Sequence, residues 1–231
     1  MKKIGVIGGM SWQSTQTYYR AINEGVNAKL GGLHSAEMLL YSVDFGPIEQ
    51  LQHDGQWDLL GHQLAQAGQS LERAGADCII IATNTMHKVA PQVQSQLGIP
   101  LIHIADALAH ELKKQNINRV GLLGTAFTME QDFYRQRLID KHGIDVIIPD
   151  PAHRQLVHEV IYSQLCHGHV HPDSKAAYLR IINELVFDGA QGIILGCTEI
   201  GLLVQQADTD VKLFDTTYIH AQAAVDFALS L

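Results

Sequence analysis

The same order of sequence features occurs twice in this chain of 231 residues. In each half a short apolar strand ends in glycine, an aromatic pair precedes arginine, and a Gly-Ala turn leads into a second apolar strand. The matching segments are Ile4–Gly8 with Val120–Gly124, Tyr18–Arg20 with Phe133–Arg135, and Ala74–Thr85 with Asp188–Glu199. Their offsets are 116, 115 and 114 residues. Three nearly equal offsets favour a duplicated fold over the alternative, which is that any two α/β units share the order of strand, glycine and helix.

The apolar strands alternate with helical patterns. Met38–Val43 predicts a further strand, and Tyr178, Ile181, Ile182, Leu185 and Val186 mark one face of a helix. Apolar strands flanked by helices indicate parallel sheets covered on both faces. We therefore predict an α/β protein with two similar Rossmann-like lobes related by a pseudo-two-fold axis. The first lobe covers residues 1–97, the second covers 98–208, and residues 209–231 return to the first.

Thr83 and Cys197 occupy corresponding places in the repeat, each immediately after an apolar strand. In open parallel sheets, ligands bind outside the carboxyl ends of the strands. The repeat therefore predicts that these two residues face each other across a cleft that holds the active site.

Composition excludes several classes of function. Apolar residues make up 46% of the chain and charged residues 17%, so a large core is expected rather than disorder. The formal charge is −8 and no long basic run is present, which disfavours a nucleic-acid partner. No stretch has the roughly 18 apolar residues of a membrane span. Three irregularly spaced cysteines favour a reducing compartment, and we expect a soluble cytoplasmic protein.

Cys197 is the first candidate for chemistry. It follows a strand and precedes Thr198 and Glu199, where we expect a helix to begin. Main-chain N–H groups at a helix N-terminus lower the pKa of a thiol and favour the thiolate. Cys78 instead lies inside an apolar strand and is expected to be structural.

The loops after the strands offer groups that bind a carboxylate. Gly8–Ser11, Thr83–Thr85 and Cys197–Thr198 contain main-chain N–H groups, an amide and hydroxyls. The first loop reads Gly5-x-x-Gly8-Gly9 and is no dinucleotide fingerprint, so no nucleotide cofactor is expected. Glycine at such a turn also has a purely conformational explanation.

Three segments resemble the aspartate/glutamate racemase family. Ile193–Leu203, with Gly-Cys-Thr-Glu at its centre, is similar to the second signature of the family. Ile81–His87 resembles the first signature, and Met1–Tyr19 resembles the opening of the aspartate racemase branch. The resemblance covers essentially the whole chain and is greatest to the enterobacterial broad-specificity amino-acid racemases.

That resemblance implies two α/β domains with the active site between them, no pyridoxal phosphate, no metal and a homodimer. It also implies a mechanism with two cysteines, in which one thiolate removes the α-proton and the opposite thiol returns a proton. Asn84, Thr85, Thr198 and the Met10 loop would hold the α-carboxylate and ammonium of an amino acid. Glu199 would accept from the ammonium or orient Thr198.

The chain departs from the family at Thr83, where the first signature carries cysteine. A hydroxyl is a far weaker acid than a thiol. Thr83 then serves as a proton donor or relay, with or without help from His87, or the protein is a one-cysteine enzyme. The open alternatives to a racemase are a single-cysteine lyase or decarboxylase, and a weakly catalytic amino-acid-binding protein.

Substrate preference depends on a looser alignment. Family members that act on acidic amino acids use basic residues to hold the distal carboxylate. The resemblance aligns these residues with Gln52, in the loop after the second strand, and with a position near Cys166. Neither residue is basic here, so a neutral or polar side chain is expected to be tolerated at least as well as that of Asp or Glu. His167, His169 and His171 alternate in a segment that we interpret as a surface loop rather than a metal site.

Overall fold

The computed structural model describes residues 1–230, which fold into two α/β units. Of these, residues 1–107 and 217–230 form the first unit, and Leu108–Thr216 forms the second. Both boundaries lie later in the chain than the predicted residues 97 and 208. Leu101 forms a bridge with the first sheet, and residues 212–215 pair within the second sheet. Each segment therefore belongs to the unit with which it forms main-chain hydrogen bonds.

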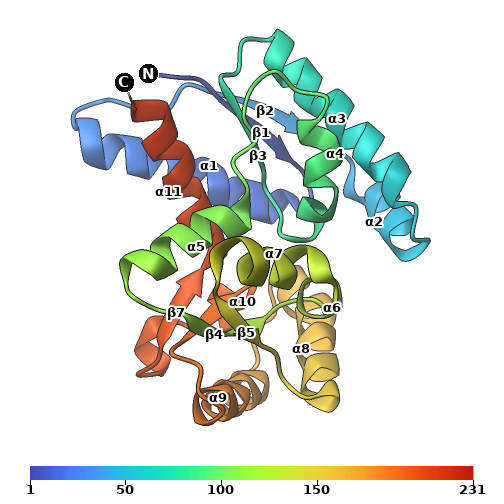
Figure 1. Cartoon of the computed structure of the whole chain (residues 1–231), viewed down its shortest axis with the longest axis vertical. Helices are drawn as coiled ribbons and strands as arrows, with labels where there is room; N and C mark the ends of the chain where they lie inside the picture. The colour runs from blue at the N-terminus through green and yellow to red at the C-terminus, as the bar shows by residue number, and fades with distance from the viewer. Residues whose placement is uncertain (231) are drawn as a thin grey trace. The chain divides into compact units, whose positions relative to one another are not determined.

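The sheet of the first unit has the order β2-β1-β3, and all three strands are parallel. The strands are β1 (Ile4–Gly8), β2 (Met38–Ser42) and β3 (Cys78–Ile81). β1 lies between the other two strands (Figure 1) and is buried over its whole length. These are the strands predicted from the apolar runs, within about one residue at their ends.

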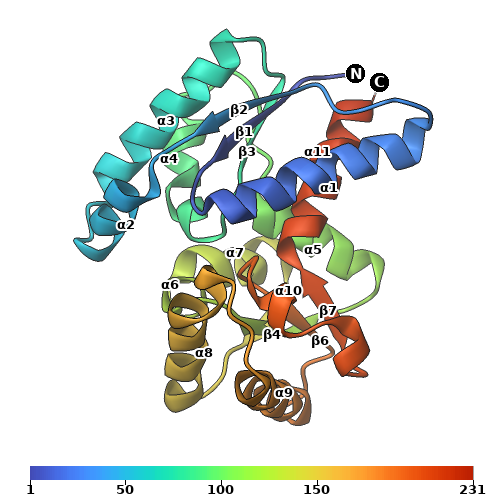
Figure 2. The same cartoon turned by 180° about the vertical axis from the view of Figure 1, so that it is seen from behind.

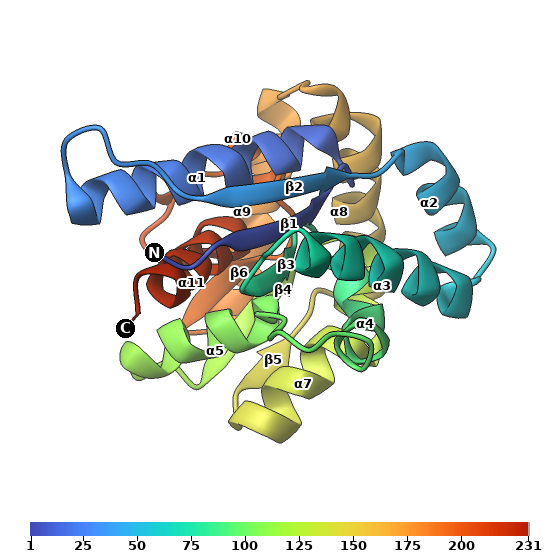
Figure 3. The same ribbon diagram turned by 90° about the horizontal axis from the view of Figure 1, so that it is seen from above.

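Helices cover both faces of this first sheet. The helices are α1 (Trp12–Leu30), α2 (Phe45–His53), α3 (Trp57–Arg73), η1 (Thr85–Val89), α4 (Ala90–Gln94), α5 (Ile104–Lys114, which crosses the boundary) and α11 (Thr216–Leu229). Figure 3 shows α3 and α4 on one face of the sheet, and α1 with α11 on the other. Figure 2 shows α1 and α11 from behind. The last helix thus completes the layer formed by the first.

The alternation of side chains along β3 explains why both faces are covered. Ile79 and Ile81 pack with α3 and α4, whereas Cys78 and Ile80 pack with α1 and α11. Successive residues of a strand point to opposite faces, so a strand of four apolar residues needs an apolar layer on each side. Cys78 is fully buried in the second of these layers, as expected for a structural cysteine.

The sheet of the second unit has the order β5-β4-β6-β7 and is also parallel throughout. Its strands are β4 (Arg119–Leu123), β5 (Asp145–Ile147), β6 (Gly192–Leu195) and β7 (Lys212–Asp215). Its helices are α6 (Ala126–Glu130), α7 (Asp132–His142), α8 (Pro151–Ser163), η2 (Leu165–His167), α9 (Pro172–Phe187), α10 (Ile200–Leu203) and η3 (Gln206–Asp208). Gly121 of β4 lets Leu185 of α9 approach the sheet, since a Cβ there would lie 3.0 Å from that side chain.

The two sheets share one topology, as the sequence repeat predicted. In each unit the first strand is central, the second lies on one side and the third on the other. β1, β2 and β3 therefore correspond to β4, β5 and β6. Within residues 1–230, no helix is both long and apolar enough to cross a membrane.

Candidate active site

Cys197 lies in a tight turn after β6. The strand ends at Leu195, and the N–H of Gly196 donates to the carbonyl of Leu123 in β4 at 2.7 Å. A Cβ on Gly196 would lie 2.9 Å from the same carbonyl oxygen, so only glycine fits this approach. The helix expected after Cys197 begins at Ile200 and is four residues long. The chain therefore turns away from the sheet with the half-buried Cys197 at its C-terminal edge.

The environment of the thiol differs from the expected one. Sγ of Cys197 donates to Oε2 of Glu199 at 2.9 Å, and the hydroxyl of Thr198 donates to the same oxygen. Desolvation, followed by the charge and hydrogen bond of Glu199, raises the pKa of Cys197 well above its usual range. The prediction that a helix N-terminus lowers this pKa is wrong here, because burial and a buried carboxylate outweigh the main-chain groups. In the resting protein Cys197 is a thiol with an acceptor in place.

Thr83 lies at the corresponding place in the first unit. β3 ends at Ile81, and the N–H of Ala82 donates to the carbonyl of Ile7 at 2.9 Å. Ser14 of α1 donates to the carbonyl of Ala82 at 3.0 Å, which ties this turn to the opening helix. The half-buried Thr83 is followed by buried Asn84 and Thr85. Thr83 thus follows β3 by two positions, and Cys197 follows the corresponding strand, β6, by the same number.

Residues 7–224 match the Asp/Glu/hydantoin racemase family. The chain belongs to this family. It is 23% identical to the broad-specificity amino-acid racemase RacX of Bacillus subtilis (strain 168), covering 98% of each chain. Among solved structures it is similar to a proposed Asp/Glu racemase from Yersinia pestis, with 56% identity and a TM-score of 0.96 over 100% of both chains. It is also similar to PH1733, an aspartate racemase homologue from Pyrococcus horikoshii OT3, with 35% identity and a TM-score of 0.89 over 100% of both chains.

Membership in this family makes the chain an isomerase of the amino-acid racemase class. The first loop of this racemase is fixed by its own hydrogen bonds. Ser11 caps α1 by accepting from the N–H of Ser14, and the N–H of Gly9 donates to the hydroxyl of Thr15 at 2.8 Å. The side chain of Met10 is buried in the core of the first unit. Met10 itself therefore offers a ligand only its main-chain groups.

Gln52 does not lie in a loop. It belongs to α2, is 5% exposed, and its amide donates to the sulfur of Met86 at 3.0 Å. The predicted location in the loop after the second strand is wrong because α2 starts directly after Asp44, which caps it. In the racemase, Gln52 packs beside η1, the helix that follows Thr83.

Sequence reasoning placed His87 near Thr83 but did not predict that His103 and His220 pack around it. His87 Nδ1 lies 2.8 Å from the carbonyl oxygen of Thr83, and its Nε2 accepts from the N–H of Ile104. The ring centroids of His103 and His220 are 4.6 and 5.4 Å from that of His87. Burial, followed by these neighbours, lowers the pKa of His87 well below its usual range. His87 is thus a neutral donor that holds the main chain of Thr83.

The sequence resemblance placed Cys166 only loosely, near a substrate-binding residue of the family. It lies in η2, and desolvation followed by the charge of Glu199 raises its pKa to about 12. The same carboxylate thus acts on two thiols, Cys166 and Cys197. The alternating histidines that follow are exposed between α8 and α9, as the surface-loop interpretation predicted. No local pattern signals the proximity of Cys166 to Glu199, because the two residues lie on different segments of the second unit.

Proposed function

We propose that this racemase interconverts the L- and D-forms of aspartate, glutamate or a related polar amino acid without a cofactor. Cys197 acts as thiolate base and acid, and Thr83 serves the other face of the α-carbon. The observation that carries the proposal is the equivalent position of the two side chains. Each follows its strand by two residues, and β3 and β6 occupy the same place in the same topology.

The chemistry requires a base on one face of the α-carbon and an acid on the other. Glu199 supplies the acceptor for the thiol proton of Cys197, since its Oε2 already receives that hydrogen bond. The thiolate then removes the α-proton and becomes a thiol again, and the hydroxyl of Thr83 returns a proton to the other face, directly or through water. Glu199 releases the proton that it took from Cys197 to water, and water reprotonates Thr83, so each turnover ends with every group in its starting state. Because a hydroxyl is a much weaker acid than a thiol, the two directions have unequal kcat values, while kcat/KM is the same for two enantiomers of equal free energy.

The neighbouring polar groups bind the amino-acid core. Asn84, Thr85, Thr198 and the main chain of the Met10 loop hold the α-carboxylate and ammonium. Glu199 orients Thr198, whose hydroxyl it accepts. Anion binding by main-chain N–H groups and hydroxyls needs no cation, and none of these residues is basic.

Neither Gln52 nor Cys166 offers a basic side chain to the distal group of the substrate. Gln52 is a neutral amide already engaged with Met86, and the pKa of Cys166 is raised by burial. We therefore expect neutral or polar side chains to be accepted at least as well as those of Asp and Glu. As part of the same proposal, which rests here on the family resemblance alone, the enzyme is a cytoplasmic homodimer; light scattering after size-exclusion chromatography tests the oligomeric state.

Exchange of the α-proton tests the proposal. In deuterium oxide, a panel of L- and D-amino acids is followed by NMR for α-deuteration and by polarimetry for loss of optical rotation. Both signals are expected for the wild type and for the control Cys78→Ala, whose thiol is buried in β3. Cys197→Ser is expected to lose both.

Other outcomes identify the alternative functions. These alternatives stay open because Cys197 carries a thiol and Thr83 does not. Release of carbon dioxide without exchange identifies a one-cysteine decarboxylase. Saturable binding without exchange identifies a binding protein. Full exchange by Cys197→Ser excludes the proposed mechanism.

A further inference from the structure

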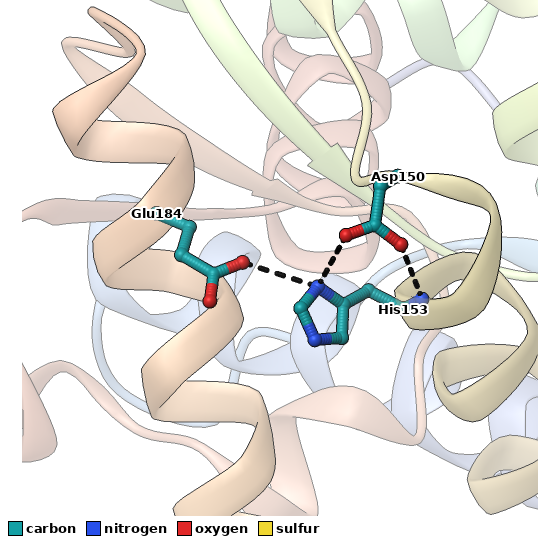
Figure 4. Close-up of side chains that lie close together, drawn as sticks. All are labelled: Asp150, His153 and Glu184. Carbon is teal, nitrogen blue, oxygen red and sulfur yellow. Dashed lines mark hydrogen bonds and ion pairs between the residues drawn. The ribbon is translucent and has the colours of Figure 1, made fainter.

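Three side chains of the second unit lie close together at the start of α8 and near the end of α9 (Figure 4). Asp150 and His153 lie at the start of α8, and Glu184 lies near the end of α9. His153 Nδ1 is 3.0 Å from Oδ2 of Asp150 and 3.1 Å from Oε2 of Glu184. Within residues 1–230, this is the only group of three or more His, Cys, Asp or Glu residues whose potential ligand atoms all lie within 4.8 Å of one another.

The two helices hold these side chains in a fixed register. Tyr178 of α9 donates to the carbonyl of Val157 in α8 at 2.8 Å, and Ser174 donates to Gln164 at 2.7 Å. These contacts follow one another along an antiparallel pair, and the His153–Glu184 contact is the next in the series. One buried and one partly buried hydrogen bond between the same two helices thus position the cluster in advance of any ligand.

The orientation of the histidine ring is unusual for a simple ion pair. Its Nδ1 is inaccessible to solvent and forms no directed N–H···O hydrogen bond, although two carboxylate oxygens are within reach. Two ligands about 2.1 Å from one metal ion, at a right angle to each other, lie about 3.0 Å apart. Both nitrogen–oxygen distances match this geometry.

We propose that Asp150, His153 and Glu184 form a site for a divalent transition-metal ion such as Mn²⁺, Co²⁺ or Zn²⁺. The ligands are Nδ1 of His153 and one oxygen from each carboxylate, a donor set that these ions accept. The other oxygen of Asp150 stays on the N–H of His153 at 2.9 Å, so the helix cap survives metal binding.

Charge favours a cation at this position. Two carboxylates, those of Asp150 and Glu184, lie on the same nitrogen of His153. Arg154, the nearest guanidinium on α8, is held by Glu130 at 2.8 Å and by the carbonyl of Pro149 at 2.9 Å. Asp150 and Glu184 are both exposed, so water has access to the remaining coordination positions. A bound ion would cross-link the start of α8 to the end of α9 without taking part in proton transfer.

Cobalt binding to the full-length protein tests the site. Protein freed of metal with a chelator is titrated with Co²⁺, followed by calorimetry and by visible absorption. One ion is expected to bind and to raise the unfolding temperature. Glu184→Gln and Asp150→Asn each remove one ligand charge and are expected to weaken binding by at least about tenfold.

Two controls separate this site from other acceptors. Glu159→Gln removes an exposed carboxylate from the same helix, and His169→Gln alters the exposed histidine segment. Both are expected to bind Co²⁺ as the wild type does. No binding by the wild type, unchanged binding by folded Glu184→Gln and Asp150→Asn, or loss of binding in His169→Gln would each overturn the proposal. Circular dichroism of the metal-free variants establishes that they are folded, and α-proton exchange is expected to be the same with and without the ion.

Discussion

The thiol of Cys197 donates a hydrogen bond to the carboxylate of Glu199, with Sγ 2.9 Å from Oε2. The two residues are separated only by Thr198, whose hydroxyl donates to the same oxygen. A buried carboxylate so close to a thiol opposes formation of a second negative charge, while it also provides a place for the thiol proton. Glu199 therefore sets how readily Cys197 becomes a nucleophilic thiolate.

Glu199→Gln is expected to lower the pKa of Cys197, because the substitution removes the charge that disfavours the thiolate. Alkylation of Cys197 by iodoacetamide, followed by mass spectrometry across a pH series, should shift to lower pH. Exchange activity should fall, since the acceptor for the thiol proton is lost. Glu159→Gln, on exposed α8 surface, serves as the control. An unchanged alkylation profile in Glu199→Gln would contradict this account.

Thr83→Cys is expected to alter the ratio of the L-to-D and D-to-L rates, because a thiol replaces a hydroxyl on one face of the α-carbon. Initial rates of exchange from each enantiomer in deuterium oxide measure that ratio. Thr17→Cys introduces a thiol on α1 and should leave both rates unchanged. If Thr83→Cys leaves the ratio at its wild-type value, Thr83 is no proton-transfer partner.

Gly9→Ala is expected to destabilise the first unit severely. Gly9 has φ +96°, and a Cβ there would lie 2.2 Å from the main-chain oxygen of Val43. Backbone strain and this collision together should cost about 3 kcal/mol or more. Gly143→Ala is the matched control, with φ +68° and no atom within 4 Å of the added Cβ, and should cost about 1 kcal/mol. Urea denaturation of both variants compares the two costs, and similar values would contradict the collision.

Acid is expected to destabilise the protein through His220. Burial lowers the pKa of His220 from 6.5 to about 4 in the folded state. The unfolded chain therefore binds the proton first, so stability is complete above about pH 6.5 and is lost as the pH falls toward 4. This histidine alone should account for about 3 kcal/mol over that range. Denaturant titrations at several pH values measure the slope.

His220→Phe should flatten that slope. At neutral pH it should also cost about 2–4 kcal/mol, because Nδ1 pairs with the hydroxyl of Tyr18 at 2.8 Å and Nε2 with the carbonyl of Ile102 at 2.7 Å. The remaining slope comes from neighbouring groups, foremost the buried His87. His34→Gln changes an exposed histidine of the same unit and should preserve the wild-type slope. A variant His220→Phe with the full wild-type slope would show that another group carries the acid sensitivity.

The repeat in the sequence was enough to predict the α/β class, the duplicated parallel sheets and the equivalent places of Thr83 and Cys197. These features follow from local physics. Each signal extends over only a few residues: apolar runs of strand length, glycine at strand ends and helical periodicity. Such signals can be recognised in the sequence without knowledge of long-range contacts. The edge strand β5 was missed because it has only three residues, of which one is buried, and this leaves little apolar signal.

Only the tertiary structure decided the surroundings of those residues. Gln52 is buried against Met86 instead of lying in a loop, and His103 and His220 converge on His87 from distant segments. The sequence placed Cys197 after a strand, but its raised pKa depends on the burial and on the orientation of Glu199 that packing imposes. Desolvation and contact geometry are properties of segments brought together by the fold. The sequence by itself therefore determined which residues follow the strands, and packing decided their protonation and their partners.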